Sequence, residues 1–145
     1  MSRVIAIDPG LSKCGVIIAD IKEKKVYEAL VIESNLILEY AQKKYQKEMN
    51  LQFLIGNGTG CNNYIKDIKQ ITPNLIIAEE KDSTYRAKQR YFEIFPLLGL
   101  KSFLPREIFI LNKNLDALAA LIIMEDYYQV KFDFSEKVKT KTWLK

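Results

Sequence analysis

Residues 4–10, VIAIDPG, decide the fold, because a short apolar run ends there in an aspartate and a turn. A second apolar run covers 16–19 directly after Gly15, and a third covers 26–33 beyond a charged turn at 22–25. Strands joined by such short connections pair with their neighbours in opposite directions. We therefore expect these three strands to form an antiparallel meander.

The rest of the chain alternates helical and extended patterns. Amphipathic helices are expected over 35–49, 64–71, 84–95 and 112–128, and extended segments over 53–55, 75–78 and 108–111. The run 75–78 is continuously apolar, which is typical of a strand covered on both faces. This order predicts an α/β fold, with a mixed five-stranded sheet (the meander followed by βα units) and helices on both faces.

Composition bounds the class of protein. Hydrophobic residues make up 48% of the 145 residues and charged residues 28%, which predicts a single domain over 1–145, ending in a frayed basic tail over about 134–145. The formal net charge of +4 permits a polyanionic partner without requiring one. Neither a leader segment nor a membrane-spanning run is recognisable, so a cytoplasmic location is expected.

The absence of histidine excludes much of enzymology. A chain with no histidine cannot use a Ser-His-Asp or Cys-His relay, nor bind zinc or iron through imidazole. Cys14 and Cys61 are far apart in the sequence and form no CxxC motif, so they are expected to line the core in a reducing compartment. Catalysis would depend on carboxylates, lysines, hydroxyl groups or a hard metal ion.

Three acidic residues stand where a site is expected in such a sheet. Asp8 and either Glu79 or Glu80 follow predicted strands, and ligands of α/β sheets bind beyond the carboxyl ends of parallel strands. Asp116 lies early in the last helix among alanines, which allow that face to approach the sheet closely. An oxygen-only set suits Mg²⁺ or Mn²⁺, and two such ions about 3.5–4 Å apart would support phosphodiester hydrolysis.

Each acidic residue also has a simpler interpretation. Asp8 with Pro9 and Gly10 could form only a turn, Glu79 and Glu80 could be a solvated strand end, and Asp116 could complement its own helix dipole. Their combination in order favours a shared site. Between the two glutamates we favour Glu80, because strand alternation sends neighbouring side chains to opposite faces.

The glycine-rich stretch 56–60, GNGTG, lacks the Lys-Ser/Thr of a phosphate loop, so we interpret it as a tight strand-to-helix turn. The aromatic side chains of the predicted helix 84–95 are expected in the core rather than as base-stacking platforms; they are Tyr85, Tyr91, Phe92 and Phe95.

Basic residues are concentrated directly after the glutamate pair. Between 81 and 110 there are six basic against three acidic residues. Such an excess would attract a polyanion to the acidic residues. Arg86 and Arg90, spaced i and i+4, are either a solvated helix face or phosphate ligands.

Three segments resemble known nucleases. Residues 8–15, DPGLSKCG, resemble the first motif of the RuvC-type Holliday-junction resolvases. Residues 79–84, EEKDST, resemble the DER-L-[ST]-T motif of the related YqgF family, whose glutamate matches Glu80. Residues 116–128 resemble the closing helix of both, with Asp116 matching the third acidic residue. The resemblance extends from residue 3 to about 129.

The resemblance implies a ribonuclease-H-like fold and a divalent-metal-dependent endonuclease acting on structured RNA or branched DNA, as a Holliday-junction resolvase or in processing ribosomal RNA precursors. Asp8, Glu80 and Asp116 would bind Mg²⁺ or Mn²⁺ and act in catalysis. Residues near them would bind the substrate phosphates, namely Lys13, Lys81, Ser83, Thr84, Arg86 and Arg90.

Two other classes compete with this hypothesis. One is a non-catalytic nucleic-acid-binding domain of the same fold. The other is a nucleotide-binding domain of the actin and hexokinase superfamily, which needs two such domains and for which the chain is too short. Oligomeric state depends on the substrate, because cutting both arms of a junction calls for a two-fold homodimer and trimming an RNA precursor does not.

Overall fold

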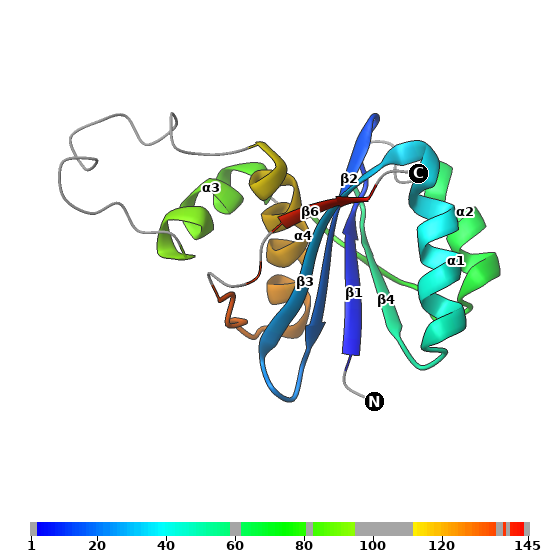
Figure 1. The fold of residues 1–145 in the computed structure, drawn as a ribbon, viewed down its shortest axis with the longest axis horizontal. Coiled ribbons are helices and arrows are strands. Elements are labelled where there is room, and N and C mark those ends of the chain that lie inside the picture. The colour runs from blue at the N-terminus through cyan, green and yellow to red at the C-terminus, as the bar shows by residue number, and fades with distance from the viewer. Residues whose placement is uncertain are drawn as a thin grey trace.

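The computed structural model describes residues 3–58, 62–80, 83–94, 112–135, 138 and 140–143. Its elements, shown in Figure 1, follow one another as β1 (Arg3–Asp8), β2 (Lys13–Asp20), β3 (Lys25–Glu33), η1 (Ser34–Leu36), α1 (Ile37–Lys47), β4 (Gln52–Gly56), α2 (Asn62–Ile71), β5 (Ile76–Ala78), α3 (Ser83–Ile94), α4 (Asn112–Tyr128) and β6 (Thr140–Trp143). The expected helices and the first five strands are confirmed to within a few residues. The extended segment expected at 108–111 lies outside the described residues.

The sheet has the strand order β5-β4-β1-β2-β3-β6. Strand β2 runs antiparallel to β1 and β3, whereas β4 and β5 run parallel to β1. The meander followed by parallel βα units is therefore confirmed, and this arrangement is that of a ribonuclease-H-like α/β fold.

The sheet differs from the expected one at both edges. The tail expected to be frayed instead contributes β6, which pairs in parallel with Ala29–Ile32 of β3 and makes the sheet six-stranded. Thr140 and Thr142 are β-branched residues that suit a strand, and the lysines between and around them hid this signal. At the other edge, β5 is the last strand of the described sheet, and its Ile77 side chain is 41% exposed. The expectation that 75–78 is covered on both faces was wrong, because the face of β5 that carries Ile77 is open to solvent.

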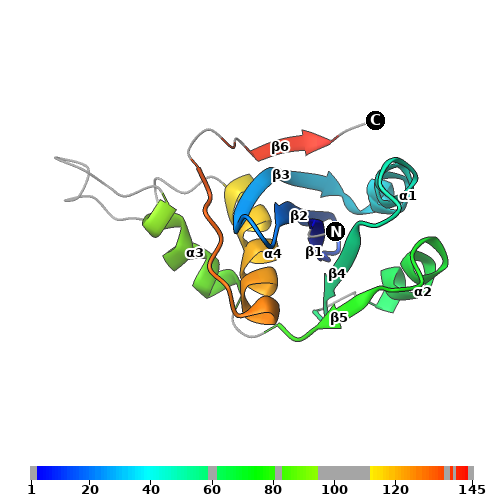
Figure 2. The ribbon, with the colours of Figure 1, turned by 90° about the horizontal axis from the view of Figure 1, so that it is seen from below.

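Helices cover both faces of the sheet, as Figures 1 and 2 show, with α1 and α2 on one side and α4 on the other. Helix α3 packs on α4 instead of on the sheet. Alternation along β1 divides the core accordingly: Val4 and Ala6 belong to the cluster on the α4 side, and Ile5 and Ile7 to the cluster on the α1 and α2 side. Of the described helices, none is long and apolar enough to cross a membrane.

Candidate functional site

Strand register brings Asp8 and Glu80 to the same face of the sheet. Ile7 of β1 pairs with Ile55 of β4, and Gly56, the next residue of β4, pairs with Ala78 of β5. Ala6 and Ala78 both belong to the cluster on the α4 side. Residues two positions further along extended chain return to the same side, so Asp8 and Glu80 both lie on the face that α4 covers.

Two glycines make room for the Glu80 carboxylate between β5 and β1. A Cβ atom placed on Gly56 would lie 2.3 Å from Glu80 Oε1, and one on Gly58 would lie 2.0 Å from Glu80 Oε2. Strand β4 separates β5 from β1 in the sheet, so Glu80 reaches Asp8 across the bare backbone of Gly56. The stretch 56–60 was interpreted as a turn, with backbone contact to a nucleic-acid phosphate as the alternative, and the space that Gly56 and Gly58 leave for Glu80 was missed. The sequence signal was a glycine inside the strand itself.

A third glycine positions Asp116. A Cβ atom on Gly15 of β2 would lie 1.7 Å from the backbone oxygen of Asp116, so α4 touches the sheet at a point where no side chain fits. Lys13 precedes Gly15 by two residues and shares its face of β2. Its Nζ atom lies 3.6 Å from Oδ2 of Asp116.

The three carboxylates act on one another electrostatically. Burial raises the pKa of Asp8 to about 9, with further contributions from a hydrogen bond to Glu80 and from the charges of Glu80 and Asp116. Burial also raises the pKa of Asp116, although Lys13 acts in the opposite direction. Without a cation, Asp8 therefore keeps its proton near neutral pH. Glu79 is exposed on the strand end, so Glu80 is the glutamate that faces Asp8.

The donor set fits a hard divalent cation. Glu80 Oε1 and Asp116 Oδ2 are buried atoms without a hydrogen-bond partner, which is costly unless something else compensates them. Within the described residues, no three acidic or cysteine side chains already surround a common point where a metal ion would sit. Asp8 and Glu80 are in contact, whereas Asp116 is turned toward Lys13.

The loop between β1 and β2 is held in place by the face opposite α4. Ser34 Oγ and Tyr64 Oη each donate a hydrogen bond of 2.9 Å to the carbonyl of Gly10, and the backbone nitrogen of Ser34 donates to Ser12. These bonds fix the backbone between Asp8 and Lys13. The Asp8 carboxylate and the Lys13 ammonium group are therefore attached to a backbone that these bonds hold in place.

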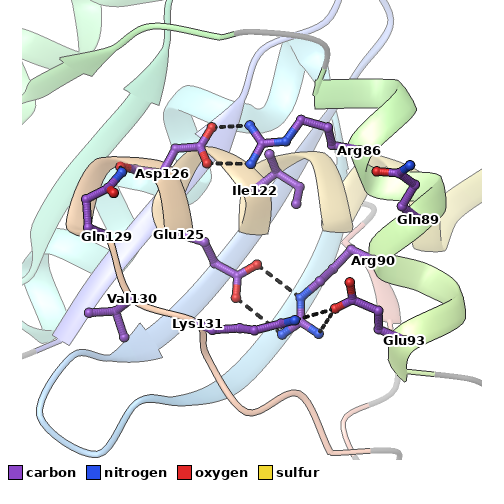
Figure 3. A pocket seen from close by; sticks show the side chains of 10 residues that line it. All are labelled: Arg86, Gln89, Arg90, Glu93, Ile122, Glu125, Asp126, Gln129, Val130 and Lys131. Atoms are coloured by element: carbon purple, nitrogen blue, oxygen red, sulfur yellow. Dashed lines mark hydrogen bonds and ion pairs between the residues drawn. The ribbon is translucent and has the colours of Figure 1, made fainter.

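Arg86 and Arg90 lie away from the carboxylates, between α3 and α4. Arg86 makes a two-pronged ion pair with Asp126, and Figure 3 shows both bonds. Arg90 is 8% exposed, and its Nε lies 3.0 Å from Glu125 Oε1. Its Nη2 donates to the carbonyl of Phe132 at 2.6 Å. Together these side chains line a polar pocket of about 350 Å³.

The contacts change the interpretation of both arginines. Neither a solvated face nor a phosphate ligand describes Arg90, because all of its guanidinium nitrogens have protein partners. Arg86 is likewise engaged by a carboxylate. Arg90 therefore joins α3 to α4 and is not available to bind substrate, whereas phosphate binding by the half-exposed Arg86 stays a prediction.

The remaining predicted substrate ligands are Lys13, which lies beside Asp116, and three residues whose side chains lie outside the described part of the structure, Lys81, Ser83 and Thr84. The aromatic residues of α3 divide between two environments. Tyr91 is buried as expected, whereas Tyr85 is 65% exposed and does not belong to the core.

No family model and no curated protein matches the chain. Among solved structures, the chain is similar to T. thermophilus RuvC in complex with a Holliday junction substrate. The two are 12% identical, the match covers 89% of this chain and 96% of that chain, and the TM-score is 0.48. This likeness is weak, and the fold assignment above rests on the strand order itself.

The space that Gly58 leaves for Glu80 predicts a variant that weakens metal binding while hardly changing the stability of the fold. In the Gly58→Ala variant the three atoms nearest the new methyl group all belong to the Glu80 carboxyl group, the far end of a flexible side chain. We expect the free energy of unfolding to change by less than about 1 kcal/mol. The Mn²⁺ affinity should fall about tenfold or more, because a misplaced ligand binds poorly. Urea denaturation and isothermal titration calorimetry measure the two quantities.

Gly56→Ala is the contrasting variant, because its methyl group would also lie 2.7 Å from Ile123 Cδ1 in the core. It should lower stability and Mn²⁺ affinity together. Equal Mn²⁺ affinity in Gly58→Ala and the wild type would show that Glu80 is not a ligand.

Proposed function

We propose that this protein is a divalent-metal-dependent endonuclease that hydrolyses phosphodiester bonds in structured RNA or branched DNA. The observation that carries the proposal is the closeness of Asp8 on β1 to Glu80 at the end of β5, with Glu80 Oε1 buried and without a hydrogen bond and with the charge of Asp116 on α4 acting on Asp8. A set of carboxylates without histidine suits Mg²⁺ or Mn²⁺. The resemblance of residues 8–15, 79–84 and 116–128 to resolvase motifs is consistent with it.

The chemistry follows from the residue types. Asp8, Glu80 and Asp116 would hold the cation, and Asp8 would lose its proton when the cation binds. When bound, such a cation supplies Lewis acidity, which makes water a better nucleophile and stabilises charge on the leaving oxygen. The rigid β1–β2 loop keeps the Asp8 carboxylate in position.

Substrate binding would fall to the basic and hydroxyl groups nearest the carboxylates. We propose Lys13, Lys81, Ser83 and Thr84 for this role, with ammonium and hydroxyl groups contacting phosphate oxygens. Contacts of this kind carry little sequence information, so the shape of the nucleic acid would decide which bond is cleaved. A homodimer would be needed only if two strands of a junction are cut together.

A cleavage assay with a matched pair of variants tests the proposal. Labelled four-way DNA junctions and a structured RNA are incubated with Mn²⁺ or with EDTA, using wild type, Glu80→Gln and Glu79→Gln. Cleavage should require Mn²⁺, persist in Glu79→Gln, whose side chain is exposed, and be lost in Glu80→Gln.

Equal cleavage by wild type and Glu80→Gln would remove this mechanism. Salt-sensitive binding without cleavage on any substrate would favour the non-catalytic nucleic-acid-binding domain instead.

A further inference from the structure

Of the basic side chains that the structure describes, Lys13 is the one that forms an ion pair with a carboxylate of the candidate site, that of Asp116. Its Nζ atom is 3.6 Å from Asp116 Oδ2, and the ion-pair partners seen for other described basic residues lie elsewhere. Asp8 and Glu80 lie on the same face of the sheet, close enough for Glu80 to raise the pKa of Asp8. Among the described residues, the positive charge nearest these carboxylates therefore lies beside Asp116.

The fold determines which residue supplies this charge. Cys14 belongs to the core on the α1 and α2 side, so the residues on either side of it, Lys13 and Gly15, face α4. Gly15 lets α4 approach until the backbone of Asp116 touches β2. A long side chain at position 13 then extends along the sheet to the carboxylate of Asp116.

The pairing has the properties of a reversible contact. The Lys13 side chain is 50% exposed and that of Asp116 is 36% exposed. The separation of 3.6 Å is longer than a hydrogen bond, unlike the buried pair of Arg90 and Glu125 at 3.0 Å. A lysine ammonium is also a compact charge on a flexible stem, which moves away without disturbing the backbone.

We propose that Lys13 is the exchangeable counter-ion of the acidic site, pairing with Asp116 when no metal is bound and giving way when a divalent cation enters. This inference rests on the proposed function, since it takes the three carboxylates as the ligands. It also accounts for the orientation of Asp116 toward β2 rather than toward Asp8 and Glu80. Lys13 is thus a positioning residue: it holds the Asp116 carboxylate while no metal is bound and releases it to the cation.

Competition between Lys13 and the metal has a measurable consequence. In Lys13→Met, Asp116 loses its ion-pair partner, so Mn²⁺ should bind about tenfold more tightly, as expected for removing a unit charge beside a divalent ion in a half-exposed site. The melting temperature in EDTA should fall for the same reason. A ligand-orienting contact without exchange would instead give weaker binding when it is removed.

Titration calorimetry of the free protein with Mn²⁺ measures the affinity without any nucleic acid or turnover. Lys13→Arg keeps the charge and adds a planar fork that can hold both oxygens of Asp116, so it should bind Mn²⁺ no more tightly than the wild type. Lys44→Met is the matched control, because it removes an ion pair of 3.1 Å with Glu28 on the α1 side of the sheet. Its Mn²⁺ affinity should equal that of the wild type.

The outcomes separate the two proposals. Tighter binding in Lys13→Met alone supports the exchange, and unchanged or weaker binding in that variant overturns it while leaving the metal site intact. If neither the wild type nor Lys13→Met binds Mn²⁺, the metal-dependent function itself fails. Binding that becomes detectable only in Lys13→Met supports the exchange in its strongest form.

Discussion

The Asp8→Asn variant is expected to lose metal-dependent cleavage and to be more stable than the wild type in EDTA. The kcat should fall about 10³-fold or more, the scale seen when a group that stabilises transition-state charge is removed. Asparagine has nearly the same shape as aspartate, and its amide donates to Glu80 the hydrogen bond that now requires a protonated Asp8. The free energy of unfolding of the metal-free protein should rise by about 1–2 kcal/mol.

The stability difference should depend on pH, with a sign set by Asp8. Its pKa is raised from 3.8 to about 9 in the folded protein, so the native state binds the proton more tightly than the unfolded chain does. The stability that this group contributes is fully present below about pH 4 and is lost as the pH rises toward 9. Asparagine does not titrate, so the advantage of Asp8→Asn in EDTA should grow from pH 5 to pH 9.

Differential scanning calorimetry measures both effects, and about 2–4 °C in Tm corresponds to each kcal/mol for a protein of this size. Mn²⁺ should raise the Tm of the wild type and leave that of Asp8→Asn nearly unchanged. Asp67→Asn is the control, because Asp67 is an exposed aspartate on α2. An Asp8→Asn protein less stable than wild type in EDTA at pH 8 would mean that the carboxylates do not repel one another.

Local patterns predicted the strands and helices because each pattern reports a face of an element. The continuous apolar run of 4–7 and the apolar stripe of 112–128 depend only on which faces of the element are buried. The position of Glu80 against Asp8 was harder to predict from the sequence, because it depends on the strand order. Strand β4 lies between β1, which ends in Asp8, and β5, which Glu80 follows. Only the lack of side chains at Gly56 and Gly58 lets the carboxylate cross that strand, and a glycine in a sequence looks the same whether it makes a turn or a space.

The prediction that Arg90 is solvated or binds phosphate was wrong for a related reason. Spacing places Arg86 and Arg90 on one face of α3 but cannot reveal that this face packs on another charged helix face. Glu125 and Asp126 were their missing partners, about 40 residues away in the chain. The charge of Arg90, which looks solvated or available to a phosphate, is buried by a helix-to-helix contact, whereas Arg86 stays 39% exposed. Burial of charge is decided by tertiary structure, which a local window does not contain.

The buried ion pair of Arg90 and Glu125 is expected to contribute strongly to the stability of the fold. In Arg90→Met, Glu125 would keep a charge in a place where its side chain is 10% exposed, and the carbonyl of Phe132 would lose its donor. Removing one partner of a buried pair costs about 3–5 kcal/mol, so we expect a loss of that size in urea denaturation. Helix α3 should loosen from α4 first, because Arg90 joins it to both α4 and the segment after it.

Arg86→Met is the matched control, since the pair of Arg86 and Asp126 is 39% and 36% exposed and should contribute less than about 1 kcal/mol. In the double variant Arg90→Met/Glu125→Met the unpaired charge is gone, so part of the loss should be recovered, giving a coupling energy of about 1–3 kcal/mol. The recovery stays incomplete because the double variant also removes the hydrogen bond of 2.8 Å that the backbone nitrogen of Phe132 donates to Glu125 in the wild type. Losses of equal size in Arg90→Met and Arg86→Met would show that burial does not distinguish the two pairs, and that α3 is held to α4 by its apolar contacts alone.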